Sequence, residues 1–320
     1  MALTHLMIMT ENVVAPMCYY RAEKNQPFTG FIAKERLTEA IAFAAAQNLS
    51  VNYLLGDHHL PDDLLDLMAQ SGGAFISPVS VSQVRPATVV IRLSEDNLVN
   101  LNESVDNVIL LVPKTALAQL ANGITLLSHL TKRINVILED IPQFTGNEFW
   151  TYTEQLEQVI ELLIAAYSRH HIFEVSVLSD RLMLGDMNNC NAGIDHVTVA
   201  PDGALYLCPA FFYHDPAHSI GHLRDGLQQK NSHLLRLDHA PICRACDAFH
   251  CKRCHFLSVT TTGEIHIPSR QQCLLSHIER DASRRLLHRL HTMGLFAKLP
   301  AIPGVDYLDP ISKTLRLLYQ

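Results

Sequence analysis

Short apolar runs alternate with longer amphipathic segments along the first 180 residues. Most runs are unbroken, which indicates parallel strands that are buried on both faces. Six segments have the composition of strands: Leu6–Met9, Val51–Leu55, Thr88–Leu93, Asn107–Pro113, Ile134–Leu138 and Phe173–Leu178. Helical periodicity fills the intervals at Ala33–Asn48, Asp62–Ser71, Thr115–Lys132 and Asn147–Arg169, and Ser94–Ser104 is a further helix candidate.

This alternation predicts an α/β fold with crossover helices. Six strands suggest a partial (β/α)6 barrel over residues 1–180, although a doubly wound sheet gives the same one-dimensional pattern. In both folds the active site lies at the carboxyl ends of the strands. The loops after the first two strands, Val14–Arg21 and Leu55–Pro61, are therefore the first places to look for chemistry.

Composition separates residues 181–320 from the predicted barrel. Seven of the eight cysteines lie from Cys190 to Cys273, and residues 1–189 contain only Cys18. Residues 1–189 carry 11 Lys+Arg against 21 Asp+Glu, a net −10, and residues 190–320 carry 14 against 11, a net +3. Neither part has the basic density of a nucleic-acid footprint. Two regions with different surroundings are predicted.

The chain is 48% hydrophobic, which is enough to form a core without disulfides. No run approaches the roughly 18 apolar residues of a membrane span. No basic segment precedes Leu6–Met9, so the start does not resemble a secretory signal. We therefore expect a soluble cytoplasmic protein whose clustered cysteines bind metal rather than form disulfides.

The cysteine spacing indicates more than one metal centre. Cys190 and Cys208 precede a compact group, Cys243-x2-Cys246-x4-Cys251-x2-Cys254, and Cys273 follows it. A CxxC pair places two thiolates on one turn, within reach of one metal ion or cluster. Seven thiolates exceed the needs of one tetrahedral zinc and favour one or two four-iron four-sulfur clusters. One or two zinc ions remain the alternative.

This segment resembles the SPASM domain, the auxiliary iron–sulfur module at the carboxyl end of many radical S-adenosylmethionine enzymes that modify peptides. The likeness rests on the cysteine order, on Ala200-Pro-Asp-Gly203-x-Leu-Tyr-x-Cys208 and on Ser219-Ile-Gly221-His-Leu. The central cysteines of the family are usually spaced two, five and three, whereas here the spacing is two, four and two.

The resemblance implies two interleaved ligand sets. Cys190, Cys208 and Cys254 would hold the first cluster, and four cysteines would hold the second: Cys243, Cys246, Cys251 and Cys273. The first set lacks a fourth thiolate, because Leu182 to Asn189 contains no cysteine. Asp186, a histidine or an open iron position would take that place.

The resemblance also shows what the barrel lacks. The family carries CxxxCxxC after the first strand, and aligning Cys18 as the middle ligand with Tyr20 as the aromatic leaves Val14 and Arg21 at the outer positions. One thiolate cannot hold the radical cluster, so ordinary radical initiation is predicted to be lost and S-adenosylmethionine is not expected. Where the family has Gly-Gly-Glu after the second strand, this chain has Leu55-Gly56-Asp57, which makes Asp57 a vestigial cofactor-binding candidate.

Three functions follow, in decreasing order of support. The first is an accessory protein of ribosomal-peptide maturation that binds a precursor peptide or a partner modifying enzyme; Met17–Tyr20 and the chain length resemble CXXX-repeat peptide maturases. The second is a zinc-stabilised interaction module that uses the basic face of a helix over Leu274–Leu295, including Arg284 and Arg285. The third is acid–base chemistry by Asp57, His58 and His59.

Overall fold

The computed structural model describes residues 3–19, 27–81, 83–94, 101, 103–184, 190–249, 251 and 253–302. Within these residues one sheet of eleven strands organises the backbone, in the order β11-β10-β9-β8-β1-β2-β3-β4-β5-β6-β7. The strands are β1 His5–Met9, β2 Ser50–Leu54, β3 Ala74–Pro78, β4 Thr88–Arg92, β5 Val105–Val112, β6 Thr131–Leu138, β7 Glu174–Val175, β8 His196–Val199, β9 Ala204–Tyr206, β10 Gly221–His222 and β11 Gly226–Leu227.

The first seven strands follow one another in chain order, each parallel to its neighbour. A doubly wound sheet would reverse its strand order at a switch point, so that alternative does not describe this topology. β8 joins the other side of β1 in parallel, and β9, β10 and β11 continue as antiparallel strands. The sheet is open, with β7 and β11 at its edges.

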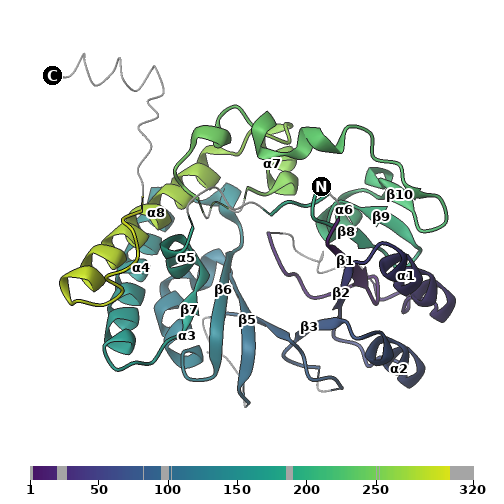
Figure 1. Cartoon of the computed structure of the whole chain (residues 1–320), viewed down its shortest axis with the longest axis horizontal. Helices are drawn as coiled ribbons and strands as arrows, with labels where there is room; N and C mark the ends of the chain where they lie inside the picture. The colour runs from purple at the N-terminus through teal and green to yellow at the C-terminus, as the bar shows by residue number, and fades with distance from the viewer. Residues whose placement is uncertain are drawn as a thin grey trace.

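Helices cover the sheet in two groups (Figure 1). α3, α4 and α8 lie beside β5 and β6, whereas α1 and α2 lie beside β1 and β2. The α-helices are α1 Lys34–Ala46, α2 Asp62–Ser71, α3 Leu120–Leu127, α4 Gly146–Tyr167, α5 Ser176–Ser179, α6 Pro209–His214, α7 His255–Thr262 and α8 Arg270–Thr292. The 3-10 helices are η1 Lys114–Gln119, η2 Ile141–Gln143, η3 Asp180–Leu182, η4 Pro216–His218, η5 Ser232–Leu235, η6 Leu237–His239 and η7 Cys243–Ala245.

Along the central strands, successive side chains point to opposite faces of the sheet and pack into two different apolar clusters. On the helix-covered face, residues such as Val108, Leu110 and Val136 pack against α3, α4 and α8. The opposite face carries a smaller apolar cluster of Val90, Ile109, Leu111 and Ile137. Both faces of these strands are thus buried, as the unbroken apolar runs predicted.

The long helix α4 begins at the predicted capping box. Thr145 is its N-cap, and the Glu148 carboxylate accepts hydrogen bonds from the Thr145 side chain and backbone. These two contacts are the main reason why the pKa of Glu148 falls to about 2. A capped helix of this length presents Leu156 and Val159 to the core, in the predicted register.

Two sequence predictions are wrong in part. Phe173–Leu178 is not one strand: only Glu174 and Val175 pair with β6, and α5 begins at Ser176 because the Ser176 hydroxyl accepts the Val136 N–H in place of a ladder partner. The helix over Thr115–Lys132 divides into η1 and α3, and its last two residues belong to β6. β3 and the short strands β8 to β11 were not predicted.

Two further helix predictions have different outcomes. The carboxyl-terminal helix starts four residues earlier than predicted, because Ser269 and Gln272 form a capping box that opens α8. The candidate helix Ser94–Ser104 lies mostly outside the described residues, and its described residues are not helical.

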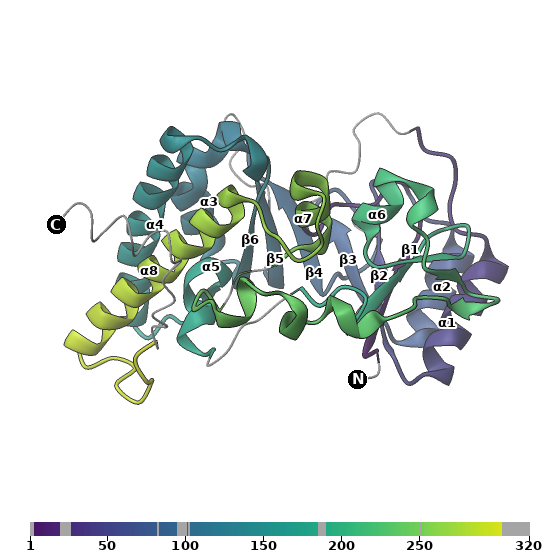
Figure 2. The same ribbon diagram turned by 90° about the horizontal axis from the view of Figure 1, so that it is seen from above.

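The predicted boundary between residues 180 and 181 falls inside η3. The sheet nevertheless continues past it, because β8 pairs with β1, and α8 packs along α4 (Figure 2). Among the described residues, no helix combines the length and the apolar character needed to cross a membrane.

Candidate metal centre

Four of the seven carboxyl-terminal cysteines lie at the starts of helices. Cys208 is the N-cap of α6, and Cys254 is the N-cap of α7, where its sulfur accepts the Leu257 N–H at 3.4 Å. Cys243 opens η7, and Cys273 lies in the first turn of α8. N–H donors at a helix start favour the thiolate, the form that binds metal.

Electrostatic coupling links each buried cysteine to others of the seven. Burial raises the pKa of Cys208 well above its usual value, and the next contributions come from Cys254 and Cys190. Burial raises the pKa of Cys254 to about 12, and the charges of Cys190 and then Cys251 add to the rise. Cys190, Cys208 and Cys254 therefore lie close enough for their charges to repel one another.

The second set contains the other four cysteines. Burial raises the pKa of Cys251 to about 12 against a Ser276 hydrogen bond that lowers it, and Cys243, Cys273 and Cys246 raise it further. Burial, Cys243 and Cys246 raise the pKa of Cys273 to about 11. Cys251 also raises the pKa of Cys254, so coupling links the two groups, and the division into the ligand sets that the family resemblance implies stays a prediction.

The donor chemistry of both sets fits iron–sulfur clusters. Thiols with pKa values this high keep their protons at neutral pH, so metal binding must displace them. In a four-iron cluster each thiolate binds a different iron, which places the sulfurs farther apart than around a single ion. Across the part of the chain that the structure describes, no three His, Cys, Asp or Glu side chains are grouped closely enough for one ion.

Helix α8 holds the second set in place through a buried carboxylate. Asp247, next to Cys246, is 3% exposed and accepts hydrogen bonds from Arg280 at 2.6 Å and Arg284 at 3.0 Å. Burial opposes its ionisation, but the two arginines outweigh that effect and lower its pKa. The same helix places His277 Nε2 3.8 Å from the Cys246 sulfur. The spacing of Cys273, His277, Arg280 and Arg284 on one helix face was the available sequence signal, and sequence reasoning missed it.

The basic face of α8 is therefore engaged within the molecule. Arg280 and Arg284 bind Asp247, Arg285 pairs with Glu157 of α4, and Arg289 binds the Glu161 carboxylate with both terminal nitrogens. The exposed pairs of Arg285 and Arg289 add little stability. Together, the ion pairs of α8 neutralise the basic helix face that the sequence analysis considered as a docking surface.

His255 lies beside the first set. It is 2% exposed, and neither ring nitrogen reaches hydrogen-bond geometry with a described residue, although the Ala192 and Leu235 backbones lie close enough to act on its charge. Burial first, and then Arg253, lower its pKa to about 4. The imidazole is therefore neutral at pH 7, which is the form that ligates metals.

The loop after β1 fills the inner face of the sheet. Ala15, Met17 and Tyr19 pack on the apolar cluster of β4, β5 and β6, while Cys18 contacts the cluster that contains Cys208. The loop is fixed where the Val14 N–H donates to the Tyr213 hydroxyl at 2.9 Å. Tyr20 and Arg21 lie outside the described residues.

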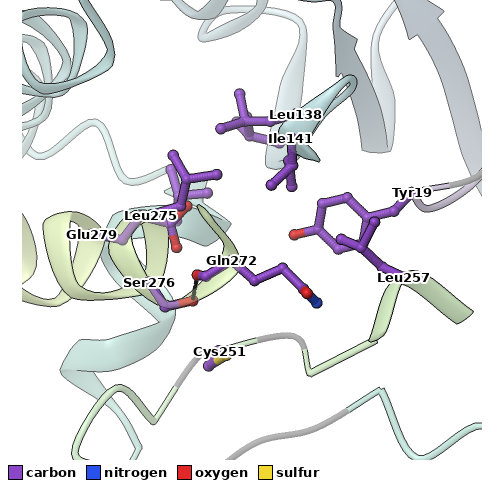
Figure 3. Close-up of a pocket in the computed structure, with 11 residues that line it drawn as sticks. Tyr19, Leu138, Ile141, Cys251, Leu257, Gln272, Leu275, Ser276 and Glu279 are labelled. Carbon is purple, nitrogen blue, oxygen red and sulfur yellow. Dashed lines mark hydrogen bonds between the residues drawn. The ribbon is translucent and has the colours of Figure 1, made fainter. Parts of the chain in front are cut away.

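Tyr19 reaches from this loop toward the second cysteine set (Figure 3). It lines a cavity of about 20 Å³, the room of one water molecule, together with Cys251, Gln272, Ser276 and Glu279. Burial raises the pKa of Tyr19 strongly, and the Glu279 charge adds to the rise. The β1 loop and the cysteine region thus meet inside the molecule.

Glu279 is itself held by two buried side chains. The Tyr152 hydroxyl donates to it at 2.8 Å, and Arg181 donates at 3.0 Å. Tyr152 and Arg181 come from α4 and η3, so α8 is fixed to both elements at the cavity wall.

The loop after β2 does not assemble an acid–base group. Asp57 is exposed and accepts a hydrogen bond from Ser80, His58 Nδ1 lies 2.5 Å from Glu11, and His59 contacts Gln83. The three candidate residues face three different partners. Sequence reasoning missed Glu11, whose side chain is fully buried just after β1; a carboxylate directly after a buried strand was the available signal.

Comparisons with known proteins support the fold alone. No protein-family model and no curated protein matches the sequence. The structure of native anSMEcpe with bound AdoMet and Cp18Cys peptide is similar, with a TM-score of 0.60 and 12% identity over 91% of this chain and 99% of that one. Streptococcus suis SuiB bound to precursor peptide SuiA gives a TM-score of 0.41 and 10% identity over 73% of this chain and 64% of that one. The chain therefore shares the fold of anSMEcpe over most of its length.

Proposed function

We propose that this chain is a peptide-maturation protein with the architecture of radical S-adenosylmethionine enzymes: a partial barrel followed by a SPASM region. It binds two iron–sulfur clusters and acts on, or presents, a precursor peptide beside a partner enzyme. The observation that carries the proposal is the gathering of seven thiols from residues 190–273 into one region where they are electrostatically coupled. The fold shared with anSMEcpe, whose structure holds AdoMet and a peptide, supports it.

Cys243, Cys246, Cys251 and Cys273 would hold one cluster, and Cys190, Cys208 and Cys254 the other. Bound clusters supply electron transfer, and an iron with an open position supplies a Lewis acid. The neutral imidazole of His255, adjacent in sequence to Cys254, is a candidate to complete the first set. Asp186 falls outside the described residues, and an open position remains the alternative.

The radical site is proposed to be lost. Val14 replaces one thiolate, and Ala15, Met17 and Tyr19 occupy the inner face where a cluster and S-adenosylmethionine would need room. Asp57 is engaged by Ser80 in an exposed turn, which supports a vestigial role. The precursor peptide would then bind outside the barrel interior, and independent radical catalysis is not expected.

Anaerobic purification followed by iron, sulfide and zinc analysis tests cluster binding. We expect about eight iron and eight sulfide atoms per chain, with the Mössbauer spectrum of four-iron clusters. Stoichiometric zinc without sulfide would contradict the proposal and favour the zinc-stabilised interaction module.

Reductive cleavage of S-adenosylmethionine tests the lost radical site separately. We expect no 5′-deoxyadenosine from the reduced, cluster-loaded chain, with an intact radical enzyme as the positive control. Robust turnover by this chain alone would refute the loss of the site.

A further inference from the structure

We propose that Cys18, on the loop after β1, is the fourth protein ligand of the first metal centre, beside Cys190, Cys208 and Cys254. This inference rests on the proposed function and assigns the ligand position that the three cysteines leave open. Three thiolates leave one iron of a four-iron cluster without a protein ligand. Cys18 is the one cysteine of the sequence that lies before residue 190, so only the tertiary fold can bring it to this set.

The loop that carries Cys18 is tied to the helix that begins at Cys208. Cys208 is the N-cap of α6, and Tyr213 of the same helix accepts the Val14 N–H at 2.9 Å. Val14 and Tyr213 are buried, so water does not compete for this hydrogen bond. Cys18 follows Val14 by four residues, which span at most about 14 Å. The six residues of α6 are about 9 Å long, so Cys18 can reach the start of the helix.

The packing of the loop brings Cys18 to the first set. Cys18 and Cys190 both pack against the apolar cluster that contains Cys208. The loop residues Ala15 and Tyr19 pack instead on the apolar face of β4, β5 and β6. The loop therefore presents Cys18 to the cysteine region, while its neighbours fill the sheet.

The remaining member of the set, Cys254, approaches the same place through aromatic contacts. Phe256 follows Cys254 by two residues on α7 and packs against both apolar clusters, the one with Cys254 and the one with the N-cap of α6. Its ring centroid lies 5.4 Å from that of Phe211, and this edge-to-face contact holds α6 and α7 side by side (Figure 2). Tyr19 packs against the cluster that contains Cys254. Cys18, the preceding residue, therefore lies on the segment that borders both helices.

A fourth thiolate suits this centre better than the other candidates. Four-iron clusters are held by four cysteine thiolates in the usual case, whereas His255 would supply a nitrogen and an open position no protein atom. Cys18 belongs to the barrel and its three partners to the cysteine region. A bound cluster would then join the two regions covalently through metal–sulfur bonds, which gives the retained cysteine a role without radical chemistry.

Iron analysis and electron paramagnetic resonance of the full-length, anaerobically loaded protein test this ligand. From about eight iron atoms in the wild type, we expect Cys18→Ala either to lose about four or to keep a cluster with one unprotected iron. Mild oxidation with ferricyanide removes such an iron and produces the signal of a three-iron cluster, which the wild type should not show. Met17→Ala is the matched control, because Met17 packs against the same apolar cluster but carries no thiolate, so its iron content and spectrum should match the wild type.

Alkylation of the wild type gives a second measurement that needs no variant. Iodoacetamide labelling followed by mass spectrometry should find Cys18 protected in the loaded protein and reactive after a chelator removes the clusters. Equal labelling of Cys18 in the two states overturns the proposal.

The outcomes separate this inference from the proposed function. Wild-type protein without inorganic sulfide contradicts the proposed function, and that measurement precedes the variants. Loaded Cys18→Ala with wild-type iron content and no three-iron signal overturns the role of Cys18, as does equal iron loss in Met17→Ala. A three-iron signal from the oxidised wild type would reveal an open position, and one from His255→Ala but not Cys18→Ala would identify the imidazole as the ligand; either result overturns the proposal.

Discussion

At the scale of single residues, Gly56 permits the loops after β1 and β2 to pack against each other. A Cβ atom at this position would lie 2.1 Å from the Val13 carbonyl oxygen and 2.2 Å from Glu11 Oε1. Both neighbours are constrained, because the Glu11 side chain is fully buried and its carboxylate contacts His58. The retained glycine of this turn is therefore explained by packing, without any ligand.

We predict that Gly56→Ala destabilises the protein by about 2–3 kcal/mol, because the backbone must move to admit the methyl group. Urea unfolding should show the change as a lower midpoint with an unchanged slope. Gly146→Ala is the control: a Cβ there meets no atom within 4 Å at the start of α4, so its midpoint should stay equal or rise. Equal midpoints for wild type and Gly56→Ala would contradict the packing argument.

At the scale of elements, α8 connects the cysteine region to the sheet. One side of the helix binds Asp247 and supplies Cys273, while another packs against α4. Its boundary follows from the capping box at Ser269, a signal that was present in the sequence. A helix that both supplies a thiol and fixes the neighbouring cysteine loop determines how the second set is spaced.

Asp247→Asn should separate this structural role from ordinary surface pairing. We expect a loss of about 3 kcal/mol, because two arginines lose a buried partner, together with reduced iron content from the second set. Asp281→Asn removes an exposed carboxylate that contacts the same arginines and should change stability by less than about 1 kcal/mol. Unfolding midpoints and iron analysis measure both effects, and equal losses in the two variants would exclude a special role of the buried contact.

Long helices and strands were predicted better from the sequence than short ones. Unbroken runs such as β5 and the long periodic helix α4 were evident, because many residues repeat one signal. β7, β10 and β11 contain two residues each and depend on tertiary partners rather than on local pattern. The clustering of the cysteines along the chain was evident from the sequence, whereas their division into two ligand sets rests on the family pattern alone and stays a prediction. The contacts of Asp247 join residues on separate elements, so the sequence offered the spacing of Arg280 and Arg284 on one helix face but not the identity of their partner.

At the scale of the whole molecule, the two predicted regions share one sheet. β8 of the cysteine region pairs with β1 in register, and Leu6, Ile8, Val197 and Val199 are all fully buried around that junction. Removing the second region would expose these side chains and leave β1 as an open edge.

We therefore predict that a fragment of residues 1–182 does not fold on its own, whereas co-expression with residues 183–320 restores a soluble complex. Circular dichroism and size-exclusion chromatography measure the outcome. A monomeric fragment that unfolds cooperatively would show that the regions are independent.

The packing of the loop after β1 affects whether a radical cluster site could be restored there. Ala15, Met17 and Tyr19 are part of the apolar interior, so the segment that would have to accommodate a cluster now stabilises the sheet. Restoring two cysteines would leave that interior filled, and clearing it would expose Val90, Ile109 and Leu111 of the strands beneath. On the proposed loss of the radical site, its restoration would require changes in the apolar interior as well as two new cysteines. The packing that stabilises the folded chain would then itself oppose that restoration.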